Sequence, residues 1–278
     1  MRCPFFAISP ALLLSAAALF SPAVPAAQGH GDVHEAIVTL TREIEAKPGS
    51  APLLFERASL YSTYDHWTEA LSDLDQVAAL EPAHEMQSVL RASVLRRSGK
   101  PAEARTLQEA FLKKHPQHAQ VRWDYAQTLA DLKDTPGALR ELDTLIAAAE
   151  HPPPDTVALR LRLAEAADAA AALTWLDGFL AKHPLPVFQE EALRLETKLG
   201  RHAAALARMD KMIAAAPRPE FLLLRKAELL TATGDAPAAA TTARAAQAAI
   251  ARLPAHIRST KACAELESKA ARILSPPP

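Results

Sequence analysis

Small apolar residues recur along this chain with a period of 34 residues. Alanine marks one place of the period five times in succession, and after the loss of one residue the series resumes: Ala36, Ala70, Ala104, Ala138, Ala172, Ala205 and Ala239. A fixed period of this length is typical of stacked units, each of which buries its apolar face only against its neighbours. The pattern therefore predicts a stack of similar units.

Each period contains the pattern of two helices followed by a stop. In its first half a second small residue recurs, at Ala58, Ala92 and Ala126, and such residues let two helices approach closely. After its second half comes a proline, at Pro48, Pro82, Pro116, Pro184 and Pro217. Proline ends a helix because it lacks an N–H and clashes with the preceding turn. Each unit is thus predicted to be helix, turn, helix and stop.

The unit at residues 51–84 has the most complete pattern: Leu54, Ala58, Tyr61, Ala70, Leu74 and Pro82. This pattern resembles the tetratricopeptide repeat, and the chain as a whole resembles exported bacterial proteins of that family. The resemblance implies an all-α fold, a right-handed α-solenoid of helix-turn-helix repeats with about fourteen helices. Six units starting near residues 51, 85, 119, 153, 186 and 220 fill residues 51–254. A half repeat at residues 27–50 precedes them, and a capping helix with a proline-rich tail, residues 255–278, follows.

One stretch departs from the pattern. Arg160 falls where the repeat requires a small residue, next to the run from His151 to Pro154, and the following turn contains no glycine. We expect an irregular stacking angle around residues 150–200, without a break into two domains there.

The first 26 residues are predicted to be a secretory signal peptide. A basic Arg2 is followed by the apolar run from Ala11 to Phe20 and by the small-residue sequence Val24-Pro25-Ala26. The alternative is an uncleaved anchor, but the apolar run is short for a membrane span. We expect export, to the periplasm or as a secreted protein, and no stable membrane insertion once the leader is removed.

Charge and motifs exclude several function classes. The formal net charge of −1 gives no basis for a basic face, so neither nucleic acid nor anionic lipid is expected as a partner. The chain contains no phosphate-binding loop, zinc-protease motif or nucleophile elbow, so we expect no enzyme activity and no cofactor. Cys263 lies on the apolar stripe of the last helix, which favours burial over pairing between chains.

The resemblance also places a binding groove on the first helices of the units. One row along it reads Phe55, Val89, Trp123, Val157 and Leu224, and the flanking positions are Ser59, Ser62, Arg96, Arg97, Gln127 and Asp131. Aromatic residues beside arginine are typical of binding hot spots. Phe55 and Trp123 either bind in the groove or pack between helices. We expect an adaptor or scaffold of the cell envelope that holds an extended peptide or a helix of another protein.

A second hypothesis is an exported metal-binding protein. If cleavage follows Ala27, His30 becomes the third residue of the mature chain, and His34 lies close behind it. An N-terminal amine, two amides and such an imidazole form a square-planar site for Cu(II) or Ni(II). An enzyme of unrecognised type is a third alternative.

Overall fold

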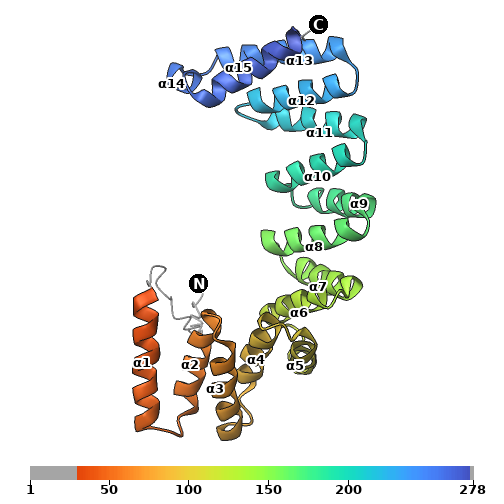
Figure 1. Ribbon diagram of the computed structural model, residues 1–278. Coiled ribbons are helices and arrows are strands. Elements are labelled where there is room, and N and C mark those ends of the chain that lie inside the picture. Colours follow the sequence, from red (N-terminus) through yellow and green to blue (C-terminus); the bar gives the residue numbers. More distant parts are fainter. Residues whose placement is uncertain (1–29, 276–278) are drawn as a thin grey trace, which may run out of the picture. The chain divides into compact units, whose positions relative to one another are not determined.

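The computed structural model describes residues 30–275, and within that part the chain forms fifteen helices and no strand (Figure 1). The all-α prediction is confirmed. The chain divides into two compact units, one ending at Gln87 and the other beginning at Ser88. This division falls inside a helix, at a place where the sequence shows no irregularity, whereas residues 150–200 lie inside the second unit.

The first unit contains one helix and one complete helical hairpin. Its helices are α1 (His30–Ala46), α2 (Ala51–Thr63) and α3 (Trp67–Leu80), followed by the start of α4 (Glu85–Arg97), which continues into the second unit. Leu54 and Val77 are buried at the centre of this unit, and Ile44 of α1 packs against them.

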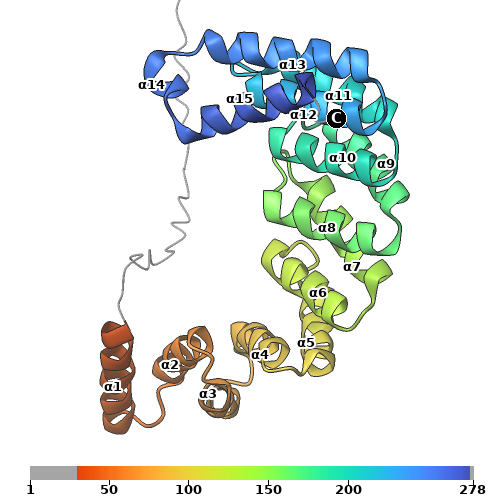
Figure 2. The same cartoon turned by 45° about the horizontal axis from the view of Figure 1, so that its top comes forward.

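The second unit continues the same architecture in a stack of hairpins (Figure 2). The helices that follow α4 are α5 (Pro101–Lys114), α6 (Ala119–Asp131), α7 (Thr135–Ala148), α8 (Pro154–Ala167), α9 (Ala169–Leu180), α10 (Pro186–Lys198), α11 (His202–Ala215), α12 (Glu220–Ala232), α13 (Ala236–Ala251), α14 (Ala255–Arg258) and α15 (Lys261–Leu274). The first helix of each hairpin begins at, or one residue from, the unit starts expected from the period.

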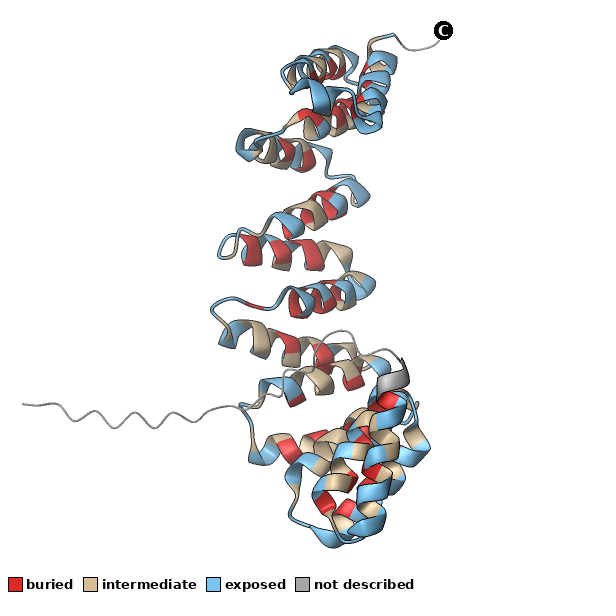
Figure 3. Cartoon of the chain, turned by 90° about the vertical axis from the view of Figure 1, so that its left-hand side faces the viewer, coloured by how far each residue is buried: buried red, intermediate tan, exposed pale blue. Residues whose placement is uncertain are grey.

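The repeat alanines explain why each hairpin closes tightly. From Ala70 to Ala239 all six are buried, and five of them have no exposed surface. Buried residues recur along the helices of the chain (Figure 3). A methyl group at a helix crossing lets the two backbones approach, and the larger side chain four residues later fills the space beside it, as Leu74 and Leu142 do. The period in the sequence is therefore a period of helix crossings.

Most hairpins turn through one residue with a left-handed backbone. Glycine takes this place at Gly99, Gly200 and Gly234, where φ lies between 68° and 85°. Asp65 and Lys133 take it elsewhere, with φ of 65° and 63°. The hairpin of α8 and α9 differs, because Asp168 alone joins its two helices.

That short junction accounts for the irregularity at Arg160. The buried places of α6 recur in α8 after 35 residues: Val121, Ala126 and Leu129 correspond to Thr156, Leu161 and Ala164. Leu161 thus takes the place of the small residue at the crossing, and the assignment of that place to Arg160 was wrong by one residue. Arg160 Nε instead donates to Asp143 Oδ1 at 2.9 Å, and the guanidinium lies 3.9 Å from the ring centre of Trp175.

The last helices cover the end of the stack. Leu266 and Ala270 of α15 pack against Leu224 of α12 and Ala243 of α13. The single capping helix expected within residues 255–278 is interrupted after α14, and the Thr260 hydroxyl then caps α15 by accepting from the Cys263 amide. Cys263 is a free thiol and is buried, as the apolar stripe predicted.

None of the described helices is both long enough and apolar enough to cross a bilayer. The expected leader lies outside the described residues, so its cleavage stays a prediction.

Candidate functional site

Ion pairs link the neighbouring first helices of the second unit in a row, except that the described residues provide none between α6 and α8. Arg96 of α4 contacts Asp131 of α6, with Nη1 and Oδ2 3.2 Å apart. Glu165 of α8 accepts from Arg194 and Lys198 of α10 at 2.5 and 2.7 Å, and Arg225 of α12 contacts Glu190 of α10 at 2.5 Å. This row is the face on which the family resemblance placed the groove.

The Glu165 carboxylate accepts hydrogen bonds from two basic side chains of the row at once. Hydrogen bonds from Arg194 and then Lys198 lower the pKa of the Glu165 carboxyl to about 2, because they favour its charged form. The same hydrogen bond from the other side raises the pKa of Arg194 above its usual value. The charged groups of Glu165, Arg194 and Lys198 are paired with one another, so this stretch of the row offers no unpaired charge of these residues to a ligand.

A cavity of about 440 Å³ opens in the row between α4, α6 and α8. We call it the Trp123 cavity, and its lining is Arg96, Trp123, Gln127, Ala130, Asp131, Asp155, Ala158, Leu159 and Arg162. Four of the residues that the sequence suggested for a groove, Arg96, Trp123, Gln127 and Asp131, therefore surround one space.

Trp123 both packs and faces the cavity. Its ring is partly buried against Ala126, Leu142 and Leu159, while the rest of it lines the open space. The two alternatives drawn from the sequence thus describe two sides of one residue. Truncating this ring must affect the stability of the fold as well as the shape of the cavity.

Polar groups in the Trp123 cavity are only partly paired. Arg96 holds Asp131, yet its Nε is buried without a hydrogen-bond partner among the described residues. Asp155 and Arg162, two turns apart on α8, have no ion pair in the described part of the chain. The cavity therefore offers one free charge of each sign, Asp155 and Arg162, beside the ring of Trp123.

The other predicted groove residues are distributed differently. In the first unit Phe55 packs against Leu54 and Val77, and its ring centre lies 4.9 Å from that of His84. Ser59 is exposed, whereas Ser62 is only 4% exposed and is not offered to a ligand. On α4, Val89 is partly buried and Arg97 is exposed.

Two members of the predicted row are core residues. Val157 is fully buried because α8 is shifted by one residue, and Ala158 lines the cavity in its place. Leu224 is buried beneath the capping helix α15. The row predicted from the sequence is therefore wrong at these two positions.

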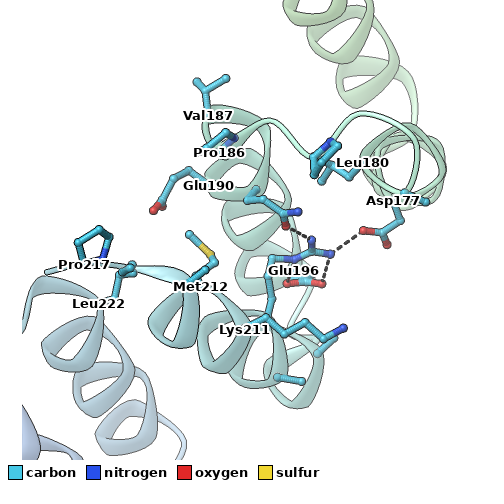
Figure 4. Close-up of a pocket in the computed structure, with 18 residues that line it drawn as sticks. Asp177, Leu180, Pro186, Val187, Glu190, Glu196, Lys211, Met212, Pro217 and Leu222 are labelled. Atoms are coloured by element: carbon cyan, nitrogen blue, oxygen red, sulfur yellow. Dashed lines mark hydrogen bonds and ion pairs between the residues drawn. The ribbon is translucent and has the colours of Figure 1, made fainter. Parts of the chain in front are cut away.

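A second and larger cavity, which the sequence did not suggest, lies between α9, α10 and α11 and reaches the start of α12 (Figure 4). Its volume is about 1040 Å³, and we call it the α9–α12 cavity. Figure 4 shows Val187, Met212, Pro217 and Leu222 on the side of the cavity away from Asp177, whereas Leu180 lies beside Asp177.

Arg208 organises the polar end of the α9–α12 cavity. Its Nε and Nη2 donate to both oxygens of Glu196 at 2.9 and 2.8 Å, Nη1 donates to Gln189 at 2.7 Å, and Nη2 also reaches Asp177 at 2.5 Å. Glu196 is only 3% exposed. The hydrogen bonds to Glu196 raise the pKa of Arg208 against the opposing effect of burial.

A sign inversion in the sequence could have indicated this cavity. Asp73 and Glu141 lie three residues after repeat alanines, and each binds an arginine of the first helix of its hairpin. Arg208 stands at the same place after Ala205 and binds an acid of the first helix instead. The reversed pair lets Arg208 also reach Asp177 on the preceding second helix.

The metal hypothesis rests mostly outside the described side chains. His34 is exposed on α1, and the side chain of His30 is not described. Among the side chains that the structure does describe, no three histidine, cysteine, aspartate or glutamate residues are grouped to hold an ion. The Cu(II) or Ni(II) site at His30 and His34 stays a prediction.

Comparison with known proteins supports the fold. Residues 95–163 match the family model described as tetratricopeptide repeat. No curated protein matches the sequence.

Solved structures share the architecture at low sequence identity. A tetratricopeptide repeat protein from Parabacteroides merdae is 15% identical, with a TM-score of 0.51 over 87% of this chain and 93% of that one. The C-terminal part of a repeat protein from Cytophaga hutchinsonii is 14% identical, with a TM-score of 0.59 over 84% and 94%. A chain in the structure of Naa15/Naa10 bound to HypK-THB is 18% identical, with a TM-score of 0.54 over 88% of this chain and 39% of that one. The predicted helical solenoid is confirmed.

Proposed function

Because this chain is built of tetratricopeptide repeats, we propose that it is a non-enzymatic scaffold that holds another protein along its first helices. The repeat fold suggests protein–protein interaction, and one similar structure contains several proteins bound together. The observation that carries the proposal is the Trp123 cavity, the gap in a row that ion pairs otherwise close.

The cavity suits a side chain of a bound peptide. Its apolar wall of Trp123, Ala130, Ala158 and Leu159 provides area to bury, and a partly exposed tryptophan beside arginine is a common hot spot. The guanidinium of Arg162, which lines the cavity without an ion pair among the described residues, supplies a donor for a backbone carbonyl of an extended segment. A cavity of about 440 Å³ admits one or two side chains, so we propose a short anchor motif and not a long buried helix.

The leader motif supports a place for this scaffold in the cell envelope. If the segment ending at Ala26 directs export, the partner is a periplasmic or envelope protein.

Photo-crosslinking tests the proposal. A photoreactive amino acid in place of Gln127, at the cavity, should capture a discrete envelope protein that mass spectrometry can identify. The same amino acid in place of Ala148, exposed on the second helix α7, should not. Equal capture at both positions would contradict the assignment of the groove.

With the captured partner in hand, Trp123 variants separate binding from packing. Trp123→Phe should keep most of the packing against Leu142 and weaken binding by about 1 kcal/mol. Trp123→Ala should weaken binding by about 2 kcal/mol or more and also lower the melting temperature. Gln127→Ala, which removes no buried apolar group, should affect binding alone.

A further inference from the structure

Four large apolar side chains among the described residues are exposed, two in each unit. In the first unit Leu80 and Met86 are 45% and 47% exposed, at the two sides of the connection between α3 and α4. In the second unit Val187 and Phe221 are 59% and 52% exposed, and Val187 lines the α9–α12 cavity while Phe221 precedes its lining residue Leu222. Exposed apolar side chains that form a contiguous patch mark interaction sites.

The two places differ in form. Residues 80–86, which we call the apolar loop, comprise the last residue of α3, the connection 81–84 and the first two residues of α4, and Glu81, Pro82 and Ala83 are all exposed. The other place is hollow, and a volume of about 1040 Å³ is large enough to receive several side chains. One surface projects two apolar side chains, and the other offers a space lined by Met212, Leu222 and Pro217.

The charges of the two places are complementary. The apolar loop contains Glu81 and Glu85 and neither lysine nor arginine, and Glu81 has no ion pair in the described part of the chain. In the α9–α12 cavity each acidic residue of the lining already binds an arginine. Lys211 is the only charged residue of that lining without an ion pair among the described residues.

We propose that the apolar loop of one copy of this chain docks in the α9–α12 cavity of a second copy. Leu80 and Met86 enter the space beside Met212 and Leu222, and Glu81 lies near Lys211 at the edge. Because the two surfaces are different, the contact is heterologous and adds copies head to tail. The contact area is small, so association is weak and requires micromolar or higher concentrations.

Sedimentation velocity on the purified chain without its expected leader tests the proposal. The weight-average mass should rise with concentration. Glu81→Lys and Lys211→Glu should each weaken association about fivefold, because each replaces an attractive pair with two like charges. The double variant restores opposite charges and should recover association to near the original strength. Leu80→Ser should weaken it about tenfold or more, because it removes buried apolar area.

Controls and a second measurement distinguish this interface from non-specific association. Glu103→Lys and Lys113→Glu, both exposed on α5, are matched charge reversals and should leave association unchanged. A disulfide between cysteines introduced by Glu81→Cys and Lys211→Cys should produce a ladder of linked copies, since Cys263 is buried. A mass independent of concentration, failure of the double reversal to restore association, or a disulfide only within single chains would overturn the proposal.

Discussion

Removing the Arg208 side chain should destabilise the second unit more than removing Arg208 and Glu196 together. Arg208→Met leaves the Glu196 carboxylate, 3% exposed, without the guanidinium that donates to both of its oxygens. Breaking a buried ion pair by deleting one partner costs about 3–5 kcal/mol, because the remaining charge stays desolvated. The adjoining cavity lets water approach from one side, so we expect the lower end, about 3 kcal/mol.

The double variant Arg208→Met, Glu196→Met removes both charges and keeps similar volume, and it should come within about 1 kcal/mol of the original stability. Urea unfolding followed by circular dichroism gives the free energy of unfolding of the original chain, of Arg208→Met, of Glu196→Met and of the double variant. A single variant no less stable than the double variant would refute the assignment of Glu196 as a desolvated charge.

Three further predictions concern the repeat, the groove face and the leader. Ala70→Leu should overpack the crossing of α2 and α3 and cost about 1–3 kcal/mol, whereas Ala79→Leu, exposed on the same helix, should change the melting temperature little. The stability contributed by Glu165, whose pKa is lowered to about 2, is present above pH ~4.5 and is lost as pH falls through 2. Arg194→Met should therefore bring that pKa closer to its ordinary value in a carbon-detected NMR titration, and an unchanged pKa would show that the cluster is not formed in solution. N-terminal sequencing of the exported protein should begin at Ala27, and an intact residue 2 or 3 on a cytosolic protein would disprove the leader.

The helical repeat could be predicted from the sequence because each crossing needs a methyl group at a fixed spacing. Ala70, Ala104 and Ala138 are buried where the period required it. The frame of α8 could not be predicted, because Pro153 and Pro154 are both acceptable at the start of a helix and only the burial of Leu161 distinguishes them. One residue of shift was enough to move Val157 from the expected groove into the core.

The candidate sites were predictable only where they follow the repeat. Arg96, Trp123, Gln127 and Asp131 occupy recurring places on first helices, and the structure gathers them around one cavity. The α9–α12 cavity depends on which side chains fail to fill a space between helices, and no local pattern records that. The ion-pair inversion at Arg208 is a sequence signal, but its meaning appears only once Asp177 and Gln189 are seen beside it.

The single-residue junction at Asp168 couples the unfolding of the two helices that it connects, α8 and α9. Asp168 ends α8 and at the same time caps α9, where its Oδ1 accepts from the amides of Ala170 and Ala171 at 2.8 and 3.0 Å. Neither helix can therefore fray there without disturbing the other. In a linear array, loss of structure spreads inward from the ends one hairpin at a time. Unfolding that reaches α8 or α9 from a terminus therefore disturbs both helices, because Asp168 is the only residue between them. We expect α8 and α9 to unfold together and their amides to exchange with solvent at the same rate.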